Sequence, residues 1–214
     1  MKRVIIFVNG NLSDISRAKK IINKQDYLIA ADGGVKHILK LGLIPQIIIG
    51  DLDSTPLSIQ KKLERKKIEW IKYPIKKDKT DFELVIDYIL EKKFKEIIIF
   101  GIFGDRIDHF IANILLLSKI QTENKSIKIK IIEGNKEIYI LDKKIVVNGH
   151  IGDEVSIIPL NNKLKGITTD GLEYKLNNES LSFGSTKGIS NVFNKTSAKI
   201  EAKKGTALIV HLRN

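Results

Sequence analysis

Cysteine is absent from this 214-residue sequence. The absence excludes disulfide bonds, thiolate metal sites and a cysteine nucleophile. It also fits a reducing compartment, and we therefore expect a cytoplasmic protein.

Long apolar runs are missing too. No stretch approaches the roughly 20 consecutive apolar residues that a membrane-spanning helix needs. The charged start Met1-Lys2-Arg3 leads directly into the β-branched run Val4–Val8, so we expect no export signal and no membrane partner. With 43% hydrophobic residues the chain can bury a sizeable core, in one large domain or two modest ones.

Acidic residues are fewer than basic ones: 25 Asp and Glu stand against 37 Lys and Arg, a net charge of +12. Such an excess can indicate a nucleic-acid partner, because Lys and Arg neutralise phosphates. The basic residues are spread along the whole chain, however, and no segment interleaves them with aromatics as a stacking platform would. We predict no nucleic-acid partner. The positive field would instead concentrate an anionic substrate such as a nucleotide.

Short β-branched runs alternate with helical segments over the first 133 residues. This pattern predicts an α/β domain, a mostly parallel Rossmann-like sheet covered by helices. Continuous Ile runs suit strands that are buried on both faces, and apolar spacing predicts a helix beginning near Thr80. The expected strands are Val4–Val8, Tyr27–Ala31, Gln46–Ile49, Glu69–Tyr73, Glu96–Phe100 and Ile127–Ile132.

After about Glu133 no convincing amphipathic helix appears, and short alternating segments are separated by Asn, Gly and Lys. This change predicts a smaller all-β domain, so we expect domains at residues 1–133 and 134–214. Asn148-Gly149 and Asn161-Asn162 are turn signals. The expected strands are Glu137–Leu141, Lys144–Val147, Glu154–Pro159, Leu172–Leu176, Ala198–Ala202 and Ala207–Leu212.

Polar and acidic residues follow four consecutive strands of the predicted parallel sheet. Ligands of such sheets bind outside the carboxyl ends of the strands, so these residues should share one edge. Carboxylates gathered there repel one another unless a cation lies among them, and hard oxygen ligands favour magnesium. The segments are Asn9-Gly10, Asp32-Gly33-Gly34, Gly50-Asp51-Leu52-Asp53-Ser54, and a loop with Asp78, Thr80 and Asp81.

Asp51 and Asp53 are the natural metal ligands, because two carboxylates two residues apart can turn toward one ion. A lone Asp-x-Asp is more often a solvated turn or a helix N-cap. The position after a buried strand, beside Asp32, favours the metal site here. For Asp32-Gly33-Gly34, an anion site at a helix start and an ordinary strand-to-helix turn are equally good interpretations.

Thr80 and Glu83 form a capping box that leaves Asp78 and Asp81 available, and the flanking lysines can neutralise phosphate oxygens.

The strand Glu96–Phe100 leads into a glycine-bearing loop and an apolar helix. Arg106 is the phosphate-binding candidate there, because a guanidinium near a helix N-terminus suits a polyphosphate. His109 and Asn113 lie four residues apart on one helix face and are interpreted as hydrogen-bonding supports, with Asp108 nearer the chemistry. The chain has no Walker motif, protein-kinase signature or Gly-x-Ser-x-Gly elbow.

In this order, these residues resemble the thiamine pyrophosphokinase family. Each motif is weak alone, but the set is specific jointly and spans nearly the whole chain. The motifs are Asn9-Gly10, Ala31-Asp32-Gly33-Gly34, Gly50-Asp51-Leu52-Asp53-Ser54, Asp78-x-Thr80-Asp81-x-Glu83, Gly104-x-Arg106-x-Asp108-His109-x-x-x-Asn113 and Gly188-x-Ser190-Asn191.

The resemblance implies an α/β catalytic domain followed by a β-sandwich domain. It also implies magnesium-dependent transfer of pyrophosphate from ATP to thiamine, by a homodimer that holds thiamine at the subunit interface. By motif, the resemblance implies three groups of residues. Asp51, Asp53, Asp78 and Asp81 would belong to the magnesium and phosphate site, Arg106 and Asp108 would lie beside the nucleotide phosphates, and Ser190 and Asn191 would help hold thiamine.

One position departs from the family pattern: Asp105 stands where a second glycine is usual, between Gly104 and Arg106. We expect Asp105 to point outward as an N-cap; otherwise this loop binds differently. Trp70 is expected in the core, and Phe193 is a weak candidate for stacking on the substrate.

Two other functions remain possible from the sequence. A metal-dependent phosphohydrolase would use the same carboxylates, and a non-catalytic nucleotide- or RNA-binding module would rely on the lysines. In the kinase, Asp78 or Asp81 would accept the hydroxyl proton.

Overall fold

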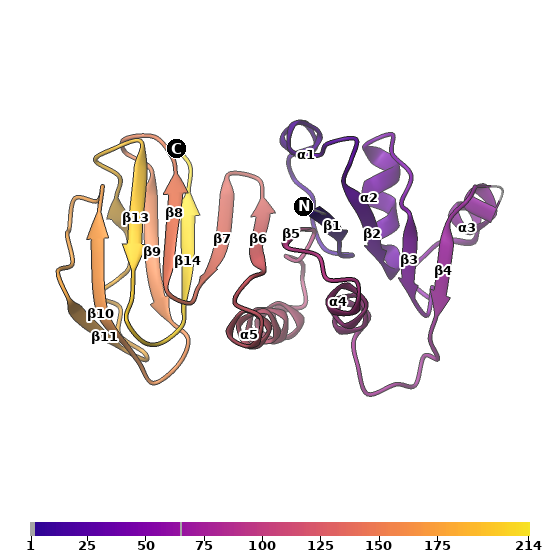
Figure 1. Cartoon of the computed structure of the whole chain (residues 1–214). Coiled ribbons are helices and arrows are strands. Elements are labelled where there is room, and N and C mark those ends of the chain that lie inside the picture. The colour runs from indigo at the N-terminus through magenta and orange to yellow at the C-terminus, as the bar shows by residue number, and fades with distance from the viewer. Residues whose placement is uncertain (1–2, 65) are drawn as a thin grey trace. The chain divides into compact units, whose positions relative to one another are not determined.

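The computed structural model describes residues 3–64 and 66–214. They fold into two compact units (Figure 1). Unit 1 contains the chain up to Leu116 together with Ser126–Gly134, and unit 2 contains Leu117–Lys125 and Asn135–Asn214. The predicted division into functional domains at residues 1–133 and 134–214 stays a prediction.

Unit 1 is a parallel sheet with the strand order β4-β3-β2-β1-β5-β6, accompanied by helices. All six predicted strands are present, with ends at most one residue from the expected positions. The strands are β1 (Arg3–Phe7), β2 (Tyr27–Ala31), β3 (Ile47–Gly50), β4 (Glu69–Lys72), β5 (Glu96–Phe100) and β6 (Lys128–Glu133).

The inner strands of this sheet are buried on both faces. Ile47, Ile48 and Ile49 are each 0% exposed, and the rings of Phe7 and Phe100 stack with centroids 5.3 Å apart. Trp70 packs against the same core, as predicted. Consecutive isoleucines therefore face helices on either side, and polar groups are left to the strand ends.

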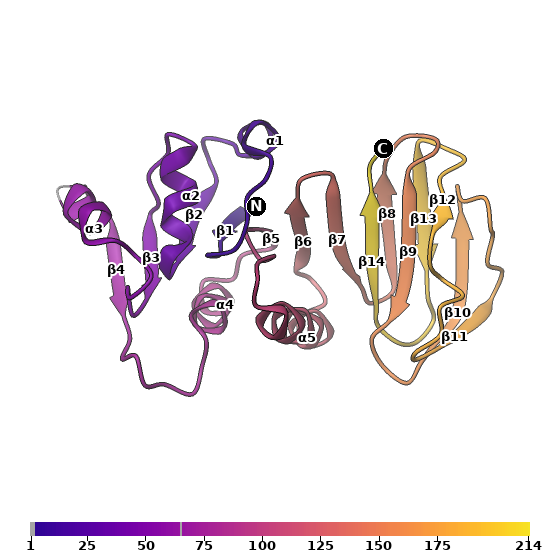
Figure 2. The same cartoon turned by 180° about the vertical axis from the view of Figure 1, so that it is seen from behind.

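Helices and one 3₁₀ turn connect these strands (Figures 1 and 2). The predicted start of α4 at Thr80 is confirmed, because the Thr80 hydroxyl accepts from the backbone N–H of Glu83 at 3.2 Å. No helix in the described part of the chain is long and apolar enough to cross a membrane. The elements are α1 (Ile15–Ile21), η1 (Asp32–Gly34), α2 (Val35–Lys40), α3 (Leu57–Glu64), α4 (Asp81–Glu91) and α5 (Ile107–Glu123).

Unit 2 is a sandwich of two antiparallel sheets, with strand orders β12-β9-β14-β7 and β11-β10-β13-β8. Apolar side chains from both sheets, such as Ile157 and Ile200, form one buried core. The strands are β7 (Lys136–Leu141), β8 (Lys144–Asn148), β9 (Glu154–Pro159), β10 (Lys163–Asp170), β11 (Glu179–Ser182), β12 (Asn191–Val192), β13 (Ser197–Glu201) and β14 (Ala207–Leu212).

Two predictions in this unit were wrong. Leu172–Leu176 is not a strand; Leu172 forms only an isolated bridge with Phe193. Three strands were missed: β10, β11 and β12. In β10, Gly166 interrupts the alternating pattern and the pairing shifts at a bulge. Phe193 is 1% exposed, so its ring belongs to the core and cannot stack on a substrate.

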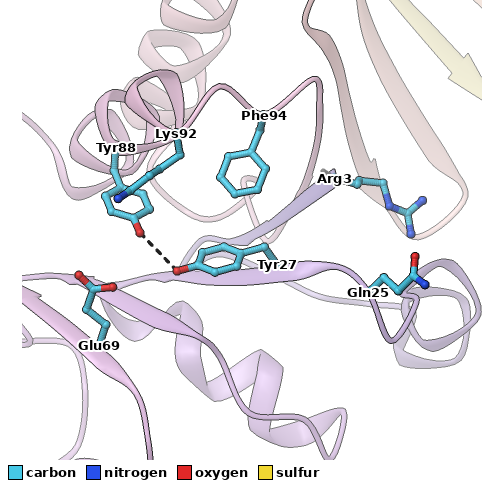
Figure 3. Close-up of a pocket in the computed structure, with 7 residues that line it drawn as sticks. All are labelled: Arg3, Gln25, Tyr27, Glu69, Tyr88, Lys92 and Phe94. Atoms are coloured by element: carbon cyan, nitrogen blue, oxygen red, sulfur yellow. Dashed lines mark hydrogen bonds between the residues drawn. The ribbon is translucent and has the colours of Figure 1, made fainter. Parts of the chain in front are cut away.

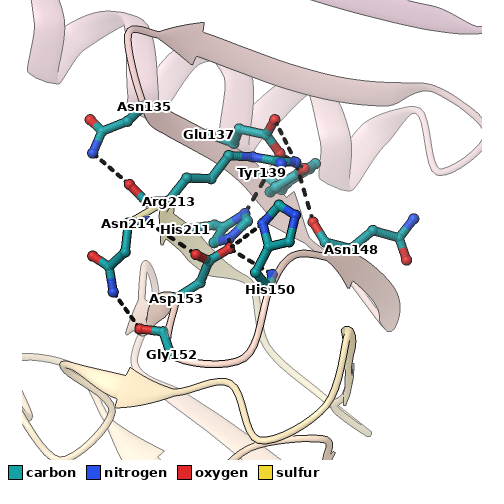
Figure 4. Close-up of polar contacts among 10 residues, drawn as sticks. All are labelled: Asn135, Glu137, Tyr139, Asn148, His150, Gly152, Asp153, His211, Arg213 and Asn214. Atoms are coloured by element: carbon teal, nitrogen blue, oxygen red, sulfur yellow. Dashed lines mark hydrogen bonds and ion pairs between the residues drawn. The ribbon is translucent and has the colours of Figure 1, made fainter.

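A buried ionic cluster fixes the end of β14 (Figure 4). His211 is 0% exposed, and its Nε2 lies 2.8 Å from Asp153 Oδ2 while Nδ1 lies 3.7 Å from Glu137 Oε2. Arg213 Nη2 lies 3.3 Å from Glu137 Oε1, and the backbone N–H of Asn214 donates to Asp153 Oδ1 at 3.1 Å. The cluster connects β14 to β7 and to the turn before β9.

Removal of the Asp153 carboxylate should destabilise unit 2. Burial opposes its ionisation, but hydrogen bonds from the His150 backbone, His211 and the Asn214 backbone lower the pKa of Asp153 overall. We expect Asp153→Ala to lower the unfolding free energy by about 3–5 kcal/mol near neutral pH, because it leaves buried partners unpaired. The measurement is chemical denaturation of the full chain.

A carboxyl group whose pKa is lowered by folding stabilises the folded state at pH values above its unfolded-state pKa. This stabilisation is lost as the pH falls through the pKa of the folded state. The difference in unfolding free energy between wild type and Asp153→Ala should therefore become smaller below about pH 4. The control is Asp170→Ala, which removes an exposed partner of Lys195 and should change stability little. Equal effects of the two substitutions at neutral pH would contradict the structural role of the cluster.

Candidate active site

A cavity of about 680 Å³ lies at the carboxyl ends of the strands of unit 1. Among the predicted nucleotide and metal residues of this unit, only Gly33, Gly34 and Asp108 do not line it. Those that do are Asp32, Asp51, Asp53, Asp78, Thr80, Asp81, Arg106, His109 and Asn113. The predicted convergence of acidic side chains on one rim is therefore observed.

The cavity adjoins the place where the strand order reverses. The chain runs outward from β1 through β2 and β3 to β4, then returns to the other side of β1 as β5. Backbone pairing continues beyond both strands, because Val8 N–H donates to Phe100 O at 2.9 Å and Gly10 N–H to Gly101 O at 2.8 Å. Ligands of open α/β sheets bind at such a reversal.

Glycine is required where these two segments meet. A Cβ on Gly10 would lie 1.9 Å from the carbonyl oxygen of Phe103, and Gly101 has a φ of +70°. His37, buried in α2, makes a 2.8 Å hydrogen bond from Nε2 to the carbonyl of Gly10. Burial lowers the pKa of His37. His37 was not among the residues predicted from the sequence, because a lone histidine there gives no signal of its own.

Asp32 ties the end of β2 to the loop after β3. It is 5% exposed, its Oδ2 accepts from the Ser54 N–H at 3.2 Å, and its Oδ1 accepts from the Thr55 hydroxyl at 3.1 Å. Its φ of +42° lies in the left-handed region. Strained backbone of this kind is held in place by surrounding contacts and is frequent at functional sites.

The neighbouring glycines have packing explanations. A Cβ on Gly33 would meet the Asn9 side chain at 2.5 Å, and one on Gly34 would meet the Phe7 carbonyl oxygen at 2.0 Å. These contacts account for both glycines at the turn into α2. Their contact with a phosphate stays a prediction.

Three carboxylates form a cluster that suits a cation. Asp32, Asp51 and Asp53 each offer an oxygen within 4.8 Å of the others. The Asp53 N–H donates to Asp51 Oδ1 at 3.2 Å, and the Ser54 hydroxyl donates to Asp53 Oδ1 at 3.0 Å. Such a set of hard oxygen donors matches the preference of magnesium.

Lys77 bridges this cluster to the start of α4. Its Nζ lies 2.7 Å from Asp51 Oδ2 and 3.0 Å from Asp81 Oδ1. The hydrogen bond from Lys77 lowers the pKa of Asp51. Burial raises the pKa of Asp81, against the effect of Lys77 and with added repulsion from Asp51 and Asp32. The sequence predicted the flanking lysines only as phosphate contacts, so this bridge was not expected.

Arg106 and Asp108 form an exposed ion pair at the start of α5, with Nη2 and Oδ2 2.6 Å apart. The Arg106 hydrogen bond lowers the pKa of Asp108 to about 2. Arg106 lines the cavity, as do His109 and the buried Asn113. The expectation that Asp105 is the N-cap was wrong: α5 begins at Ile107, so Arg106 precedes it and Asp105 lines the cavity.

The predicted thiamine residues lie in unit 2. Ser190 has a φ of +54°, and its N–H donates to the Ser156 hydroxyl at 3.0 Å. The Asn191 side chain holds a neighbouring loop: Oδ1 accepts from Tyr174 N–H at 3.0 Å, and Nδ2 donates to Tyr174 O at 2.7 Å. Asn191 therefore has a structural role, whatever its contact with a substrate.

A second cavity of unit 1, about 370 Å³, lies at the amino ends of its strands (Figure 3). Some of its polar groups are paired within the protein. The hydroxyls of Tyr27 and Tyr88 lie 3.3 Å apart, and Arg3 forms hydrogen bonds to Asp26. This cavity lacks the clustered carboxylates of the carboxyl edge.

Known proteins match both parts of the chain. Residues 18–131 match the family model of the thiamin pyrophosphokinase catalytic domain, and residues 142–207 match its vitamin B1 binding domain. The thiamine pyrophosphokinase of Bacillus subtilis is 31% identical over 98% of both chains. Thiamin pyrophosphokinase 1 of Caenorhabditis elegans is 29% identical over 96% of this chain and 87% of its own length.

Solved structures agree with this match. The crystal structure of thiamine pyrophosphokinase from Bacillus subtilis has a TM-score of 0.90 at 28% identity, covering 100% of both chains. That of thiamin pyrophosphokinase from Geobacillus thermodenitrificans has a TM-score of 0.85 at 26% identity, covering 100% of this chain and 98% of its own.

Gly10→Ala tests the close approach at the strand reversal. We expect a loss of about 1–3 kcal/mol in unfolding free energy, because the new methyl group must displace backbone. Gly104→Ala is the matched control: its Cβ would meet only Gly10 Cα, at an ordinary 3.4 Å. Thermal unfolding measures both, and equal stability of the two variants would refute the packing argument.

Proposed function

Because the chain belongs to the thiamine pyrophosphokinase family, we propose that it transfers the pyrophosphoryl group of magnesium ATP to the hydroxyl of thiamine, giving thiamine diphosphate and AMP. The observation that carries the proposal is the convergence of acidic residues from separate loops on one cavity. That cavity lies at the strand reversal, where α/β sheets bind ligands.

The residues present fit a magnesium ion. Asp51 and Asp53, which cluster with Asp32, would hold it. Asp81 would join them at the position that Lys77 occupies, and Asp32 would also support the loop that carries Asp51 and Asp53. The Lys77 ammonium between Asp51 and Asp81 supports this assignment, because it marks a point where a cation is stabilised. Bound there, magnesium would neutralise phosphate oxygens and so favour attack at phosphorus.

Nucleotide phosphates would take the remaining groups of the cavity. Arg106 would exchange its exposed partner Asp108 for a phosphate, because an exposed ion pair holds only weakly. Its guanidinium fork suits a polyphosphate. Thr80 and the backbone at the start of α4 would bind nearby, while His109 and Asn113 would orient the ligand from α5.

Proton removal from the thiamine hydroxyl requires a nearby base. Burial raises the pKa of Asp81, which suits a proton acceptor. Asp78 also lines the cavity and is the alternative. Phosphoryl transfer otherwise depends on in-line positioning and charge neutralisation rather than on covalent help from the protein.

Thiamine itself would bind through Ser190 and Asn191. The family resemblance supports this role, together with a homodimer, a cytoplasmic location and residues 1–133 and 134–214 as catalytic and thiamine-binding domains. Acidic side chains around the cavity would also suit the cationic thiazolium ring. Sedimentation velocity measures the oligomeric state directly.

The products distinguish this function from hydrolysis. Purified protein incubated with ATP, magnesium and thiamine should form AMP in step with thiamine diphosphate, because one transfer makes both. Chromatography of the mixture measures them, and omission of thiamine is the control. Phosphate release that does not depend on thiamine would support the phosphohydrolase instead.

Asp51→Asn distinguishes an enzyme from a binding module. We expect turnover to fall by at least about a hundredfold, because one carboxylate ligand of magnesium is lost, while the circular dichroism spectrum stays unchanged. Asp87→Asn is a control of the same chemistry at an exposed position of α4. Retained turnover in Asp51→Asn, with RNA bound as well or better, would favour the basic binding module.

A further inference from the structure

We propose that Lys77 is a built-in counter-ion that occupies the cation position between Asp51 and Asp81 and competes there with a divalent metal. The inference rests on the metal site of the proposed function. It adds that the same lysine weakens binding of the metal alone and strengthens binding of the nucleotide.

The position of the ammonium group is the first support. Lys77 Nζ lies 2.7 Å from Asp51 Oδ2 and 3.0 Å from Asp81 Oδ1, and the Lys77 side chain is only 14% exposed. Asp81 Oδ1 is itself buried and has no well-directed hydrogen bond within the described residues. Both carboxylates therefore direct an oxygen at one point, which the ammonium now fills.

The backbone at Gly50 packs closely against Asp32 and Asp81. A Cβ on Gly50 would lie 2.9 Å from Asp32 Cβ and 3.1 Å from Asp81 Oδ1. Glycine at the end of β3 therefore leaves room for both acidic side chains beside this strand end. Their proximity raises the electrostatic repulsion that a cation must relieve.

The neighbouring basic side chains form ion pairs with other carboxylates. Lys79 Nζ lies 2.6 Å from Asp87, and Arg106 is paired with Asp108. Within residues 3–64 and 66–214, no other lysine or arginine forms an ion pair with Asp51 or Asp81. Lys77 thus carries the neutralisation of this part of the cluster.

A divalent ion and the ammonium cannot share the same two oxygens, because like charges at that separation repel strongly. Lys77 lies in the loop between β4 and α4, and its long flexible stem allows the charge to move without the backbone. An ammonium displaced from the carboxylates remains beside the cavity that it lines. Phosphate oxygens would accept its hydrogen bonds there.

The test is manganese binding to the full-length, nucleotide-free protein, followed by electron paramagnetic resonance. We expect Lys77→Met to bind Mn²⁺ at least about tenfold more tightly than wild type, because the competing cation is gone. Lys77→Arg keeps the charge and should show no tightening. Lys79→Met removes a nearby charge outside the bridge and should change the dissociation constant by less than about threefold.

Binding of ATP should respond in the opposite direction. In the presence of saturating magnesium, Lys77→Met should weaken ATP binding, measured by isothermal titration calorimetry. Equal or weaker Mn²⁺ binding by Lys77→Met, or tightening as large in Lys77→Arg or Lys79→Met, overturns the proposal. So does unchanged ATP affinity in Lys77→Met, because the displaced lysine would then have no phosphate partner.

Two further measurements test the proposal if Lys77→Met folds poorly. Lys77→Gln keeps a hydrogen-bond donor but no charge, and should show the same tightening of Mn²⁺ binding. In a crystal structure of wild type with Mn²⁺, Lys77 Nζ should lie beyond the ion-pair limit of ~4 Å from Asp51; an intact ion pair there refutes displacement. The thiamine product assay separately decides the proposed function, because metal competition does not require turnover.

Discussion

Burial of the central strands on both faces is the constraint on which the rest of this structure depends. With Ile47–Ile49 and their neighbours in β1, β2 and β5 shielded from water, polar side chains have no place along the sheet. They are confined to the ends of the strands, where the backbone leaves the core. The carboxyl ends therefore collect Asp32, Asp51 and Asp53 at one rim. The carboxylates repel one another unless a cation lies among them. Lys77 reduces this repulsion, and so would a magnesium ion at the proposed site.

Much of this arrangement was predictable from the sequence, because the α/β unit has strong local signals. Runs of isoleucine located its strands to within one residue, and the Thr80 cap located α4. Once the strands were placed, the rule for open sheets gave the common rim without any knowledge of side-chain geometry. The β-sandwich was less accessible, since Gly166 and its bulge hide β10 from an alternating pattern.

Contacts between distant side chains were not predictable. The sequence does not predict that Lys77 contacts Asp51, 26 positions away, instead of pointing into solvent. It also does not predict that the Asn191 amide forms hydrogen bonds with the backbone of Tyr174. Phe193 has an aromatic ring of the kind that can stack on a substrate, yet the ring is buried against His211. Composition and spacing identify which chemistry a loop can supply. Tertiary packing decides which of its groups remain available for a ligand.

The order of strands in unit 2 has a consequence for biosynthesis. β14 follows β7 and β9 in the chain but lies between them in the sheet, pairing with both. As the polypeptide leaves the ribosome, β7 and β9 therefore present unsatisfied edges until β14 has emerged. Edges of this kind invite pairing with other nascent chains. The sandwich should consequently depend on chaperones more than the α/β unit does, whose six strands are all made before β7.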